Sequence, residues 1–306
     1  MKRSESSDAK GFNKKYGTIT AVIQYSAVVL CLAPIVAEYF FGIFDSWIFI
    51  VSALLYLVIT RATGMWYTSK LESIITKELN PAKLKEIINE GGIFAHMPRR
   101  HLLAAYYNGD YQQTVDMCNR GLKNCDIKQS WLFYDYLAGV YFQVGDTQSL
   151  LQVCEKFDQI VFINKSVQLY CPLMKLYKLY AKGEYSALQE LYDSPEKQKY
   201  NKAAYMVCEY IHAVNFYTVG NTEKAKEIFE KISTEAPLLG VGRLAKEQLS
   251  QIEQGQEYKI NQTSLIPNEE YKLPSSAQRA IKYGMIRNIA VVLIFVTCIL
   301  VMFILK

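Results

Sequence analysis

Residues with reactive or metal-binding side chains are sparse in this 306-residue chain. The three histidines, His96, His101 and His212, do not stand in any metal-binding motif. The seven cysteines show no paired spacing, and Cys118 and Cys125 lie too far apart for half of a structural zinc site. There is no phosphate-binding loop, nucleophile elbow or paired carboxylate site. The sequence therefore predicts no catalytic residue, no metal site and no cofactor, and we expect a protein that is not an enzyme.

The segment GVGRLA at residues 240–245 has the glycine spacing of a dinucleotide-binding fingerprint. That fingerprint needs a strand before it and an acidic residue about twenty positions after it. Pro237 and a helical pattern precede this segment instead. We therefore do not expect it to bind a dinucleotide.

Four aromatic residues form the pattern that best indicates a binding surface. Each stands three residues before a glycine: Tyr106, Phe142, Tyr180 and Tyr217. Aromatic rings offer a large and rigid contact area, so a row of them predicts a groove that holds a protein or peptide partner. The alternative is that each ring only packs between neighbouring helices. The chain has 23 Tyr and 14 Phe, and this abundance favours the packing interpretation for any single ring.

The glycines behind these aromatics recur at nearly equal intervals. Gly109, Gly145, Gly183 and Gly220 are separated by 36, 38 and 37 residues. Such intervals predict a repeat of two helices and a turn. A glycine can adopt positive φ and end the first helix, and a following Asp, Asn or Thr can cap the second. We expect the fifth residue after each glycine to face the partner helix: Thr114, Leu150, Leu188 and Ala225.

This spacing resembles the tetratricopeptide repeat (TPR) family. In the fourth unit, the family's small, aromatic and proline positions are occupied by Ala213, Phe216, Ala225, Phe229 and Pro237. The second unit matches with Tyr134, Leu137, Ala138, Tyr141 and Gly145. The first and third units depart, because Leu102 and Leu176 replace the small residue and the intervals exceed the family's 34 residues.

The resemblance implies an α-solenoid of about four helix pairs over residues 92–254, closed by a helix from about 237 to 254 that caps the stack. It also implies a concave face that contacts peptide ligands. The family's clamp for a C-terminal carboxylate uses Lys, Arg and Asn. No such set occurs here, and Asp135 stands at a contact position with the wrong charge. We therefore do not expect binding of chaperone tails.

Three apolar stretches approach the length of a transmembrane helix, which needs about twenty residues. Residues 18–37, 46–60 and 288–305 contain no charged side chain. The predicted spans are residues 18–38, residues 44–66 and a third within 279–306. The first two form an uncleaved helical hairpin over 18–67, because the first run is long for a signal peptide and a second run follows almost at once.

The basic residues that flank these spans predict an orientation. Lysine and arginine precede the first span, follow the second and precede the third, whereas the hairpin tip has none. The prediction is a multi-pass protein of the cell membrane, with the N-terminus and the solenoid cytoplasmic and the C-terminus outside. The net charge of +5 comes partly from a basic tail that suits anionic lipid, so we do not expect nucleic acid as a partner.

The remaining segments connect these parts. Residues 68–91 predict two short amphipathic helices broken at Asn80-Pro81, and residues 255–278 predict a polar tether. The predicted organisation is all-α. It comprises a basic tail (1–17), the hairpin (18–67), the connector (68–91), the solenoid (92–254), the tether (255–278) and a C-terminal span (279–306).

Two functions follow from this organisation. The first is a membrane scaffold or adaptor whose solenoid binds a protein partner in its groove and holds it at the bilayer. The alternative is a structural or assembly subunit of a larger membrane complex, contacted mainly through its transmembrane helices. Small residues of the first span would allow close helix packing in that case: Ala21, Ala27, Ala33 and Ala37.

Overall fold

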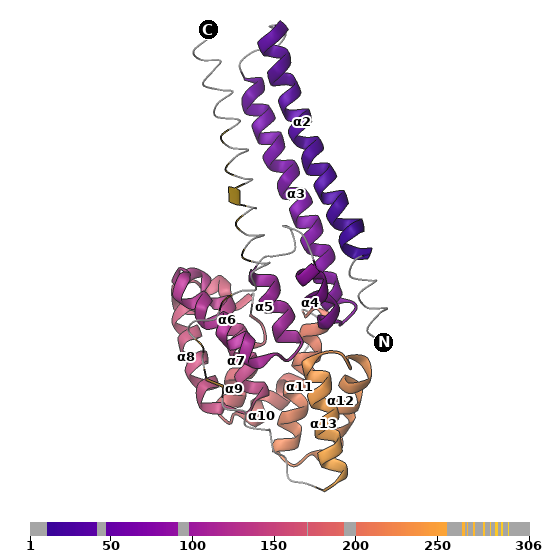
Figure 1. The fold of residues 1–306 in the computed structure, drawn as a ribbon. Helices are drawn as coiled ribbons and strands as arrows, with labels where there is room; N and C mark the ends of the chain where they lie inside the picture. The colour runs from indigo at the N-terminus through magenta and orange to yellow at the C-terminus, as the bar shows by residue number, and fades with distance from the viewer. Residues whose placement is uncertain are drawn as a thin grey trace. The chain divides into compact units, whose positions relative to one another are not determined.

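The computed structural model is all-helical over the residues that it describes, which confirms the predicted fold class at that level. These residues are 11–41, 47–90, 98–169, 171–192 and 200–255, with isolated positions beyond 264. They form twelve α-helices and no strand (Figure 1). Most of the predicted C-terminal span and most of the predicted tether lie outside the described residues.

The chain divides into two compact units. The first comprises Met1–Ser73, Lys83–His101 and Leu273–Lys306, and the second comprises Ile74–Ala82 and Leu102–Lys272. The division assigns the end of the second long helix to the second unit, and it begins the main part of that unit at Leu102.

The first unit contains two long apolar helices. A short π-helix at Asn13–Gly17 leads into α2 (Thr18–Phe41), and α3 covers Ile48–Thr76. The segments Asn13–Pro34 and Ile50–Thr76 are long and apolar enough to cross a membrane. Only 17% and 11% of their most apolar windows are buried, which distinguishes them from the core helices of a soluble domain. The first of them lies near the N-terminus, as a signal sequence also would.

The boundaries of these helices correct the sequence prediction. The predicted end of the second span and the first connector helix belong to one continuous helix, α3. No glycine–proline break or cap interrupts the chain between residues 67 and 76, because the polar side chains there fit the helix. The hydroxyls of Thr68 and Ser73, for example, donate to carbonyls one turn back, at 2.8 Å and 2.7 Å.

The predicted break at Asn80-Pro81 is confirmed. Helix α4 begins at Pro81 and ends at Glu90. Proline suits the first position of a helix, since its missing N–H would have no partner there. The apolar positions on both sides of the break are buried, as their helical spacing predicted: Leu71, Ile74, Ile75, Leu79, Leu84, Ile87 and Ile88.

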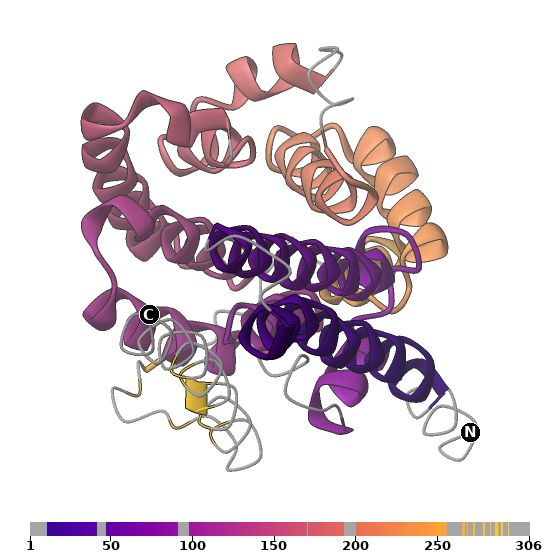
Figure 2. The same ribbon diagram turned by 90° about the horizontal axis from the view of Figure 1, so that it is seen from above.

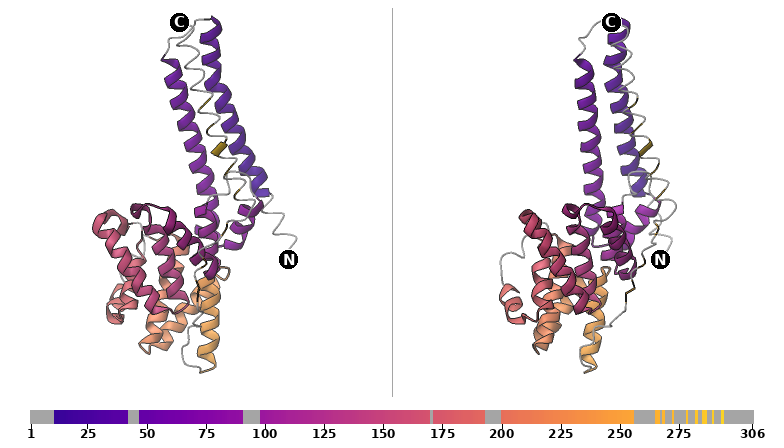
Figure 3. Two further views of the ribbon diagram at one scale, coloured as in Figure 1. Left: turned by 60° about the vertical axis from the view of Figure 1, so that its left-hand side comes forward. Right: turned by 90° about the vertical axis from the view of Figure 1, so that its left-hand side faces the viewer.

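The second unit is a series of helix pairs. The helices are α5 (Pro98–Tyr107, which begins in the first unit), α6 (Tyr111–Asn124), α7 (Trp131–Gln143), α8 (Thr147–Ile163), α9 (Met174–Ala181), α10 (Tyr185–Tyr192), α11 (Lys202–Thr218), α12 (Thr222–Glu235) and α13 (Gly240–Glu253). From α6 onward each helix packs on the next one along the chain. Alternate helices also touch, α7 with α9, α9 with α11, and α11 with α13. The pairs follow one another along a curved row (Figures 2 and 3).

The same glycine cap ends the first helix of every pair. Gly109, Gly145, Gly183 and Gly220 have φ of 71°, 75°, 72° and 85°. Each glycine N–H donates to the carbonyl three residues back at 3.0–3.2 Å, and the next N–H donates to the carbonyl five residues back at 2.8–2.9 Å. These two bonds define a Schellman motif, which satisfies carbonyls that a helix end leaves without partners. The predicted role of the four glycines is confirmed.

The second helix of each pair begins directly after this cap. Asp146 accepts a hydrogen bond from Ser149 N at 3.0 Å, and Asn221 accepts one from Lys224 N at 3.3 Å. Asp110 differs, because its carboxylate accepts from the Asn108 side chain instead of capping the helix. The fifth residue after each glycine is fully buried, as predicted: Thr114, Leu150, Leu188 and Ala225.

A fifth glycine continues the pattern, and sequence reasoning missed it. Gly255 follows α13, has φ of 64° and donates to the Ile252 carbonyl at 3.0 Å. It lies 35 residues after Gly220, but the residue three positions before it is not aromatic.

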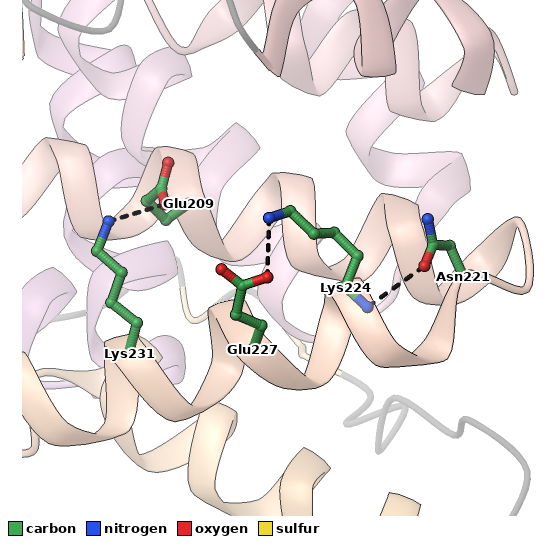
Figure 4. A network of polar contacts seen from close by, with 5 residues as sticks. All are labelled: Glu209, Asn221, Lys224, Glu227 and Lys231. Atoms are coloured by element: carbon green, nitrogen blue, oxygen red, sulfur yellow. Dashed lines mark hydrogen bonds and ion pairs between the residues drawn. The ribbon is translucent and has the colours of Figure 1, made fainter.

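A partly buried ion pair joins α11 to α12 (Figure 4). Lys231 Nζ lies 3.3 Å from Glu209 Oε2. It also donates to the Tyr205 hydroxyl at 3.0 Å. Glu209 is 1% exposed. Burial lowers the pKa of Lys231, but the bonds to Tyr205 and Glu209 outweigh it and raise the pKa overall. The pair therefore bridges α11 and α12 through a carboxylate that is almost fully buried.

Substitution of Gly220 tests the cap. No heavy atom lies within 4 Å of a Cβ placed there, so only the backbone resists a side chain. We expect Gly220→Ala to lower the free energy of unfolding by about 1.5 kcal/mol, because an L-residue is strained at positive φ. Gly220→Asn is the matched control, since asparagine tolerates this conformation, and it should cost about half as much. The measurement is urea unfolding of the full chain in detergent, followed by circular dichroism. Equal costs for the two variants would contradict the backbone explanation.

Candidate functional site

The four aromatic residues predicted to line a groove share one backbone position. The carbonyls of Tyr106, Phe142, Tyr180 and Tyr217 each accept the hydrogen bond from the capping glycine. Their side chains differ in exposure. Tyr106 is 5% exposed and Phe142 is 1% exposed, whereas Tyr180 and Tyr217 are half-buried. The four rings therefore do not form one accessible row, and this corrects the groove as predicted.

The two buried rings pack between helices. Phe142 lies edge-on against Tyr180 with ring centroids 4.8 Å apart, and it also contacts the rings of Tyr177 and Tyr210. Its position at the end of α7 directs it toward the neighbouring α9 and α11. For these rings the packing interpretation holds.

Tyr106 belongs to a buried chain of polar groups. Tyr111 donates to Gln143 Oε1 at 3.3 Å, and Gln143 Nε2 donates to the Tyr106 hydroxyl at 3.4 Å. The Tyr106 and Tyr177 hydroxyls are 3.3 Å apart. Burial raises the pKa of Tyr106 and Tyr177 well above the usual value, so both stay neutral donors. The chain satisfies polar atoms that would otherwise destabilise the core.

Tyr180 and Tyr217 each keep part of the side chain accessible. A hydrogen bond joins the Tyr180 hydroxyl to Thr218, which follows Tyr217 in α11. The Tyr180 ring also contacts Tyr185 at 5.7 Å. These contacts fix the ring in place and reduce the entropy that binding a partner would cost.

The start of α13 lies against the turn between α5 and α6. A Cβ on Gly240 would stand 2.9 Å from the Cα of Gly109, and Arg243 Nη2 donates to the Asn108 carbonyl. A Cβ on Gly242 would collide with the Ala236 carbonyl oxygen. Both glycines of GVGRLA thus serve close backbone approach at the first turn of a helix. The first and last parts of the helix series are held together here, which sequence reasoning did not anticipate.

A polar cavity of about 220 Å³ lies beside this contact. Helices α6, α7, α11 and α13 contribute its polar lining: Tyr111, Gln143, Tyr210, Arg243, Glu247 and Gln248. Its charged groups belong to α13, where Arg243 is also bound to the Leu238 carbonyl at 3.0 Å. Residues from such distant parts of the sequence show no spacing that would have revealed the cavity.

Exposed apolar side chains at and after the end of α8 are a second feature that sequence reasoning missed. Phe162 is 90% exposed and Leu169, at the end of the 3₁₀ helix Lys165–Leu169, is 82% exposed. The signal was present, because Phe162 and Ile163 fall off the apolar face that Val153, Phe157 and Ile160 define. Exposed aromatic and aliphatic side chains of this size are typical of contact surfaces.

Part of the predicted tether contacts α6. The Asn268 N–H donates to Asp116 Oδ1 at 2.8 Å, and Gln112 donates to the Ile266 carbonyl at 2.7 Å. Asp116 is buried and also accepts from Gln112. The described positions of this segment are therefore bound to the helix series.

The absence of a metal site stays a prediction from the sequence. Among the described residues, no three His, Cys, Asp or Glu side chains gather as metal ligands would. His101 and His212 are buried, and His212 lies edge-on against Tyr192 at 5.3 Å. His96 lies outside the described residues.

Comparisons with known protein families, with curated proteins and with solved structures give no match for this chain.

Asp135 gives the helix series a pH-dependent stability. Its Oδ1 is sealed from solvent without a hydrogen-bond partner among the described residues, and burial raises the pKa of this carboxyl to about 7. The folded state therefore holds a proton that the unfolded state releases near pH 4, so stability falls as pH rises from about 4 to 7 and is level above that. We expect Asp135→Asn to raise the free energy of unfolding at pH 8 by about 1–2 kcal/mol, after allowance for solvent screening. Urea unfolding at pH 5 and pH 8 measures it.

The control for this effect is the pH 5 measurement itself. At pH 5 the native carboxyl keeps its proton, and stability has fallen over only about a third of the interval from pH 4 to 7, so Asp135→Asn should raise the free energy of unfolding by about a third as much as at pH 8. A variant that shifts stability equally at both pH values would contradict titration of Asp135 as the cause.

Proposed function

We propose that this protein is an integral membrane adaptor whose helix series is a TPR-like α-solenoid that holds a protein partner at the bilayer. The main observation in favour of a solenoid is the repeated Schellman cap, which occurs at Gly109, Gly145, Gly183 and Gly220. Packing of each helix on the next and on the next but one supports it further, because a solenoid buries its core in this way.

The partner surface that we propose is smaller than an open concave groove. Tyr106 and Phe142 are inside, and the first turn is joined to α13. The half-buried Tyr180 and Tyr217 offer amphipathic rings that neighbouring contacts hold in place. Such anchors account for most of the binding energy in many interfaces.

The exposed faces of α2 and α3 support the membrane anchor. Both helices present large apolar side chains to the surroundings, among them Val29, Leu30, Leu57 and Val58. An apolar surface of this extent is unfavourable in water and favourable in hydrocarbon. We propose that both helices span the bilayer, that residues 279–306 add a third span, and that the solenoid is cytoplasmic. Of the four alanines that would favour the assembly-subunit alternative, Ala27 is buried, Ala33 is exposed, and Ala21 and Ala37 are half-buried, so that alternative stays our second candidate.

A cysteine-labelling experiment tests the anchor and its orientation. Cys125 is the only described cysteine that is not buried, so it serves as a reporter for the solenoid. In intact cells an impermeant maleimide should leave Cys125 unmodified, and lysis should allow labelling that Cys125→Ser removes. Phe41→Cys in the Cys125→Ser background reports on the far end of α2, where the side chain is 75% exposed, and should be labelled in intact cells. The reverse pattern would invert the orientation. Recovery of the chain outside the membrane fraction would contradict the anchor.

A photo-crosslinking experiment tests partner binding. With benzoylphenylalanine in place of Tyr217 in the full chain, illumination of intact cells should give a covalent adduct of higher mass. The double variant Tyr180→Ala/Tyr217→Ala, crosslinked from a flanking exposed site on α12, should lose that adduct. The probe in place of Phe162 should give none. An adduct only from position 162 would contradict the tyrosine surface, and no adduct from either position would contradict the adaptor function.

A further inference from the structure

A cavity of about 340 Å³ lies along α3 where its uncharged stretch ends. Its lining comes from one side of α3 and from Arg100 at the start of α5: Thr60, Arg61, Gly64, Met65, Tyr67, Thr68, Ser69, Glu72 and Arg100. All of these residues belong to the first unit. Arg61 is the first charged residue after position 45, and Trp66 and Tyr67 are of the types that mark a membrane interface. The cavity thus lies at the level where the proposed span meets the lipid headgroups.

The two arginines of the cavity differ in their surroundings. Arg100 is 6% exposed, donates to Thr68 Oγ1 at 2.6 Å and lies 5.6 Å from the centre of the Tyr67 ring. The Glu72 carboxylate acts on it as a counter-charge. Arg61 is exposed, and its guanidinium has neither a hydrogen bond nor an ion pair with the described residues. One positive charge in the cavity is therefore matched by Glu72 and the other is not.

The exposed surface of the cavity is mainly apolar, although the hydroxyl-bearing residues Thr60, Tyr67, Thr68 and Ser69 also line it. Met65 presents its thioether side chain, and a Cβ placed on Gly64 meets no heavy atom within 4 Å. The glycine therefore leaves space along the helix where a bulky residue would fill it. An unmatched cation beside an apolar trough is complementary to a molecule with an anionic head and a hydrocarbon tail.

We propose that this cavity binds an anionic phospholipid. The phosphate group lies between Arg61 and Arg100, and the first part of an acyl chain lies along Gly64 and Met65. A zwitterionic lipid carries a cationic head group that would come close to the two arginines. It would bind less tightly, because Glu72 is the only carboxylate in the cavity lining that could pair with this head group. The inference rests on the proposed membrane anchoring of α3.

The experiment uses the full chain in detergent, with native mass spectrometry as readout and phosphatidylglycerol and phosphatidylcholine as probes. We expect phosphatidylglycerol to bind about tenfold more tightly. Arg61→Gln should abolish the preference, and Glu72→Gln should strengthen it, because one removes the unmatched cation and the other removes the competing anion. Lys70→Gln is the matched control. It removes the same charge from the same helix, but Lys70 does not line the cavity.

Gly64→Leu is the second variant. It should fill the trough and lower the affinity for both lipids about tenfold or more, with the helical circular dichroism unchanged. It tests the acyl-chain part of the site independently of charge.

Three results would overturn the proposal. Equal losses in Arg61→Gln and Lys70→Gln would show a general surface-charge effect. Full displacement of the lipid by glycerol phosphate at millimolar concentration would show a site for a free phosphate compound that ignores the acyl chain. No preference between the two lipids would exclude an anion site. The two proposals can be told apart. If cysteine labelling shows a membrane protein but the two lipids bind equally, only the lipid site is contradicted. If the chain is recovered outside the membrane fraction, the proposed membrane anchor is contradicted as well.

Discussion

The second unit depends on one backbone conformation, the left-handed glycine that ends the first helix of each pair. A helix that stops in water can leave its last carbonyls to the solvent, but here the end is followed at once by a second helix that packs on it. The Schellman bonds satisfy the carbonyls within the chain and turn it in about two residues. The short turn brings Thr114, Leu150, Leu188 and Ala225 against the preceding helix, where each is fully buried. The cap therefore links a local backbone preference to the core.

Glycine has a different task at the contact between α13 and the first turn. Gly109 and Gly240 allow two backbones to approach more closely than any side chain permits, and Arg243 joins them by donating to Asn108. This contact determines what surface remains for a partner. It places charged groups of α13 beside a cavity whose other walls come from α6, α7 and α11. It also explains why a motif with the spacing of a nucleotide fingerprint serves packing.

The first unit differs from the second in how much apolar surface it leaves exposed. Its two long helices bury few of their side chains, so their apolar surface must be covered by something other than the described chain. Where the uncharged part of α3 ends, its side chains change from mainly aliphatic to a mixture that includes arginine, tyrosine and hydroxyl groups. This change is typical of the boundary between hydrocarbon and headgroups. The proposed anchor and the proposed lipid site thus rest on the same gradient of polarity.

The sequence by itself determined the features that depend on local chemistry. The intervals between glycines located the four caps, because positive φ is a property of single residues. The helical period of the apolar residues located the buried faces of α3 and α4, and Asn80-Pro81 located their break. Gly255 was not predicted to be a cap, because the residue three positions before it is not aromatic.

Only the tertiary structure decided which of the equivalent positions are accessible. Tyr106, Phe142, Tyr180 and Tyr217 have the same place relative to their glycines, yet two are buried and two are half-buried. Burial depends on which helices lie opposite, and those helices are far away in the sequence. For the same reason no local pattern predicted the contact between Gly109 and Gly240 or the cavity that Arg61 and Arg100 share. Spacing along the chain fixes where a helix ends, whereas the packing of distant helices fixes what its side chains can touch.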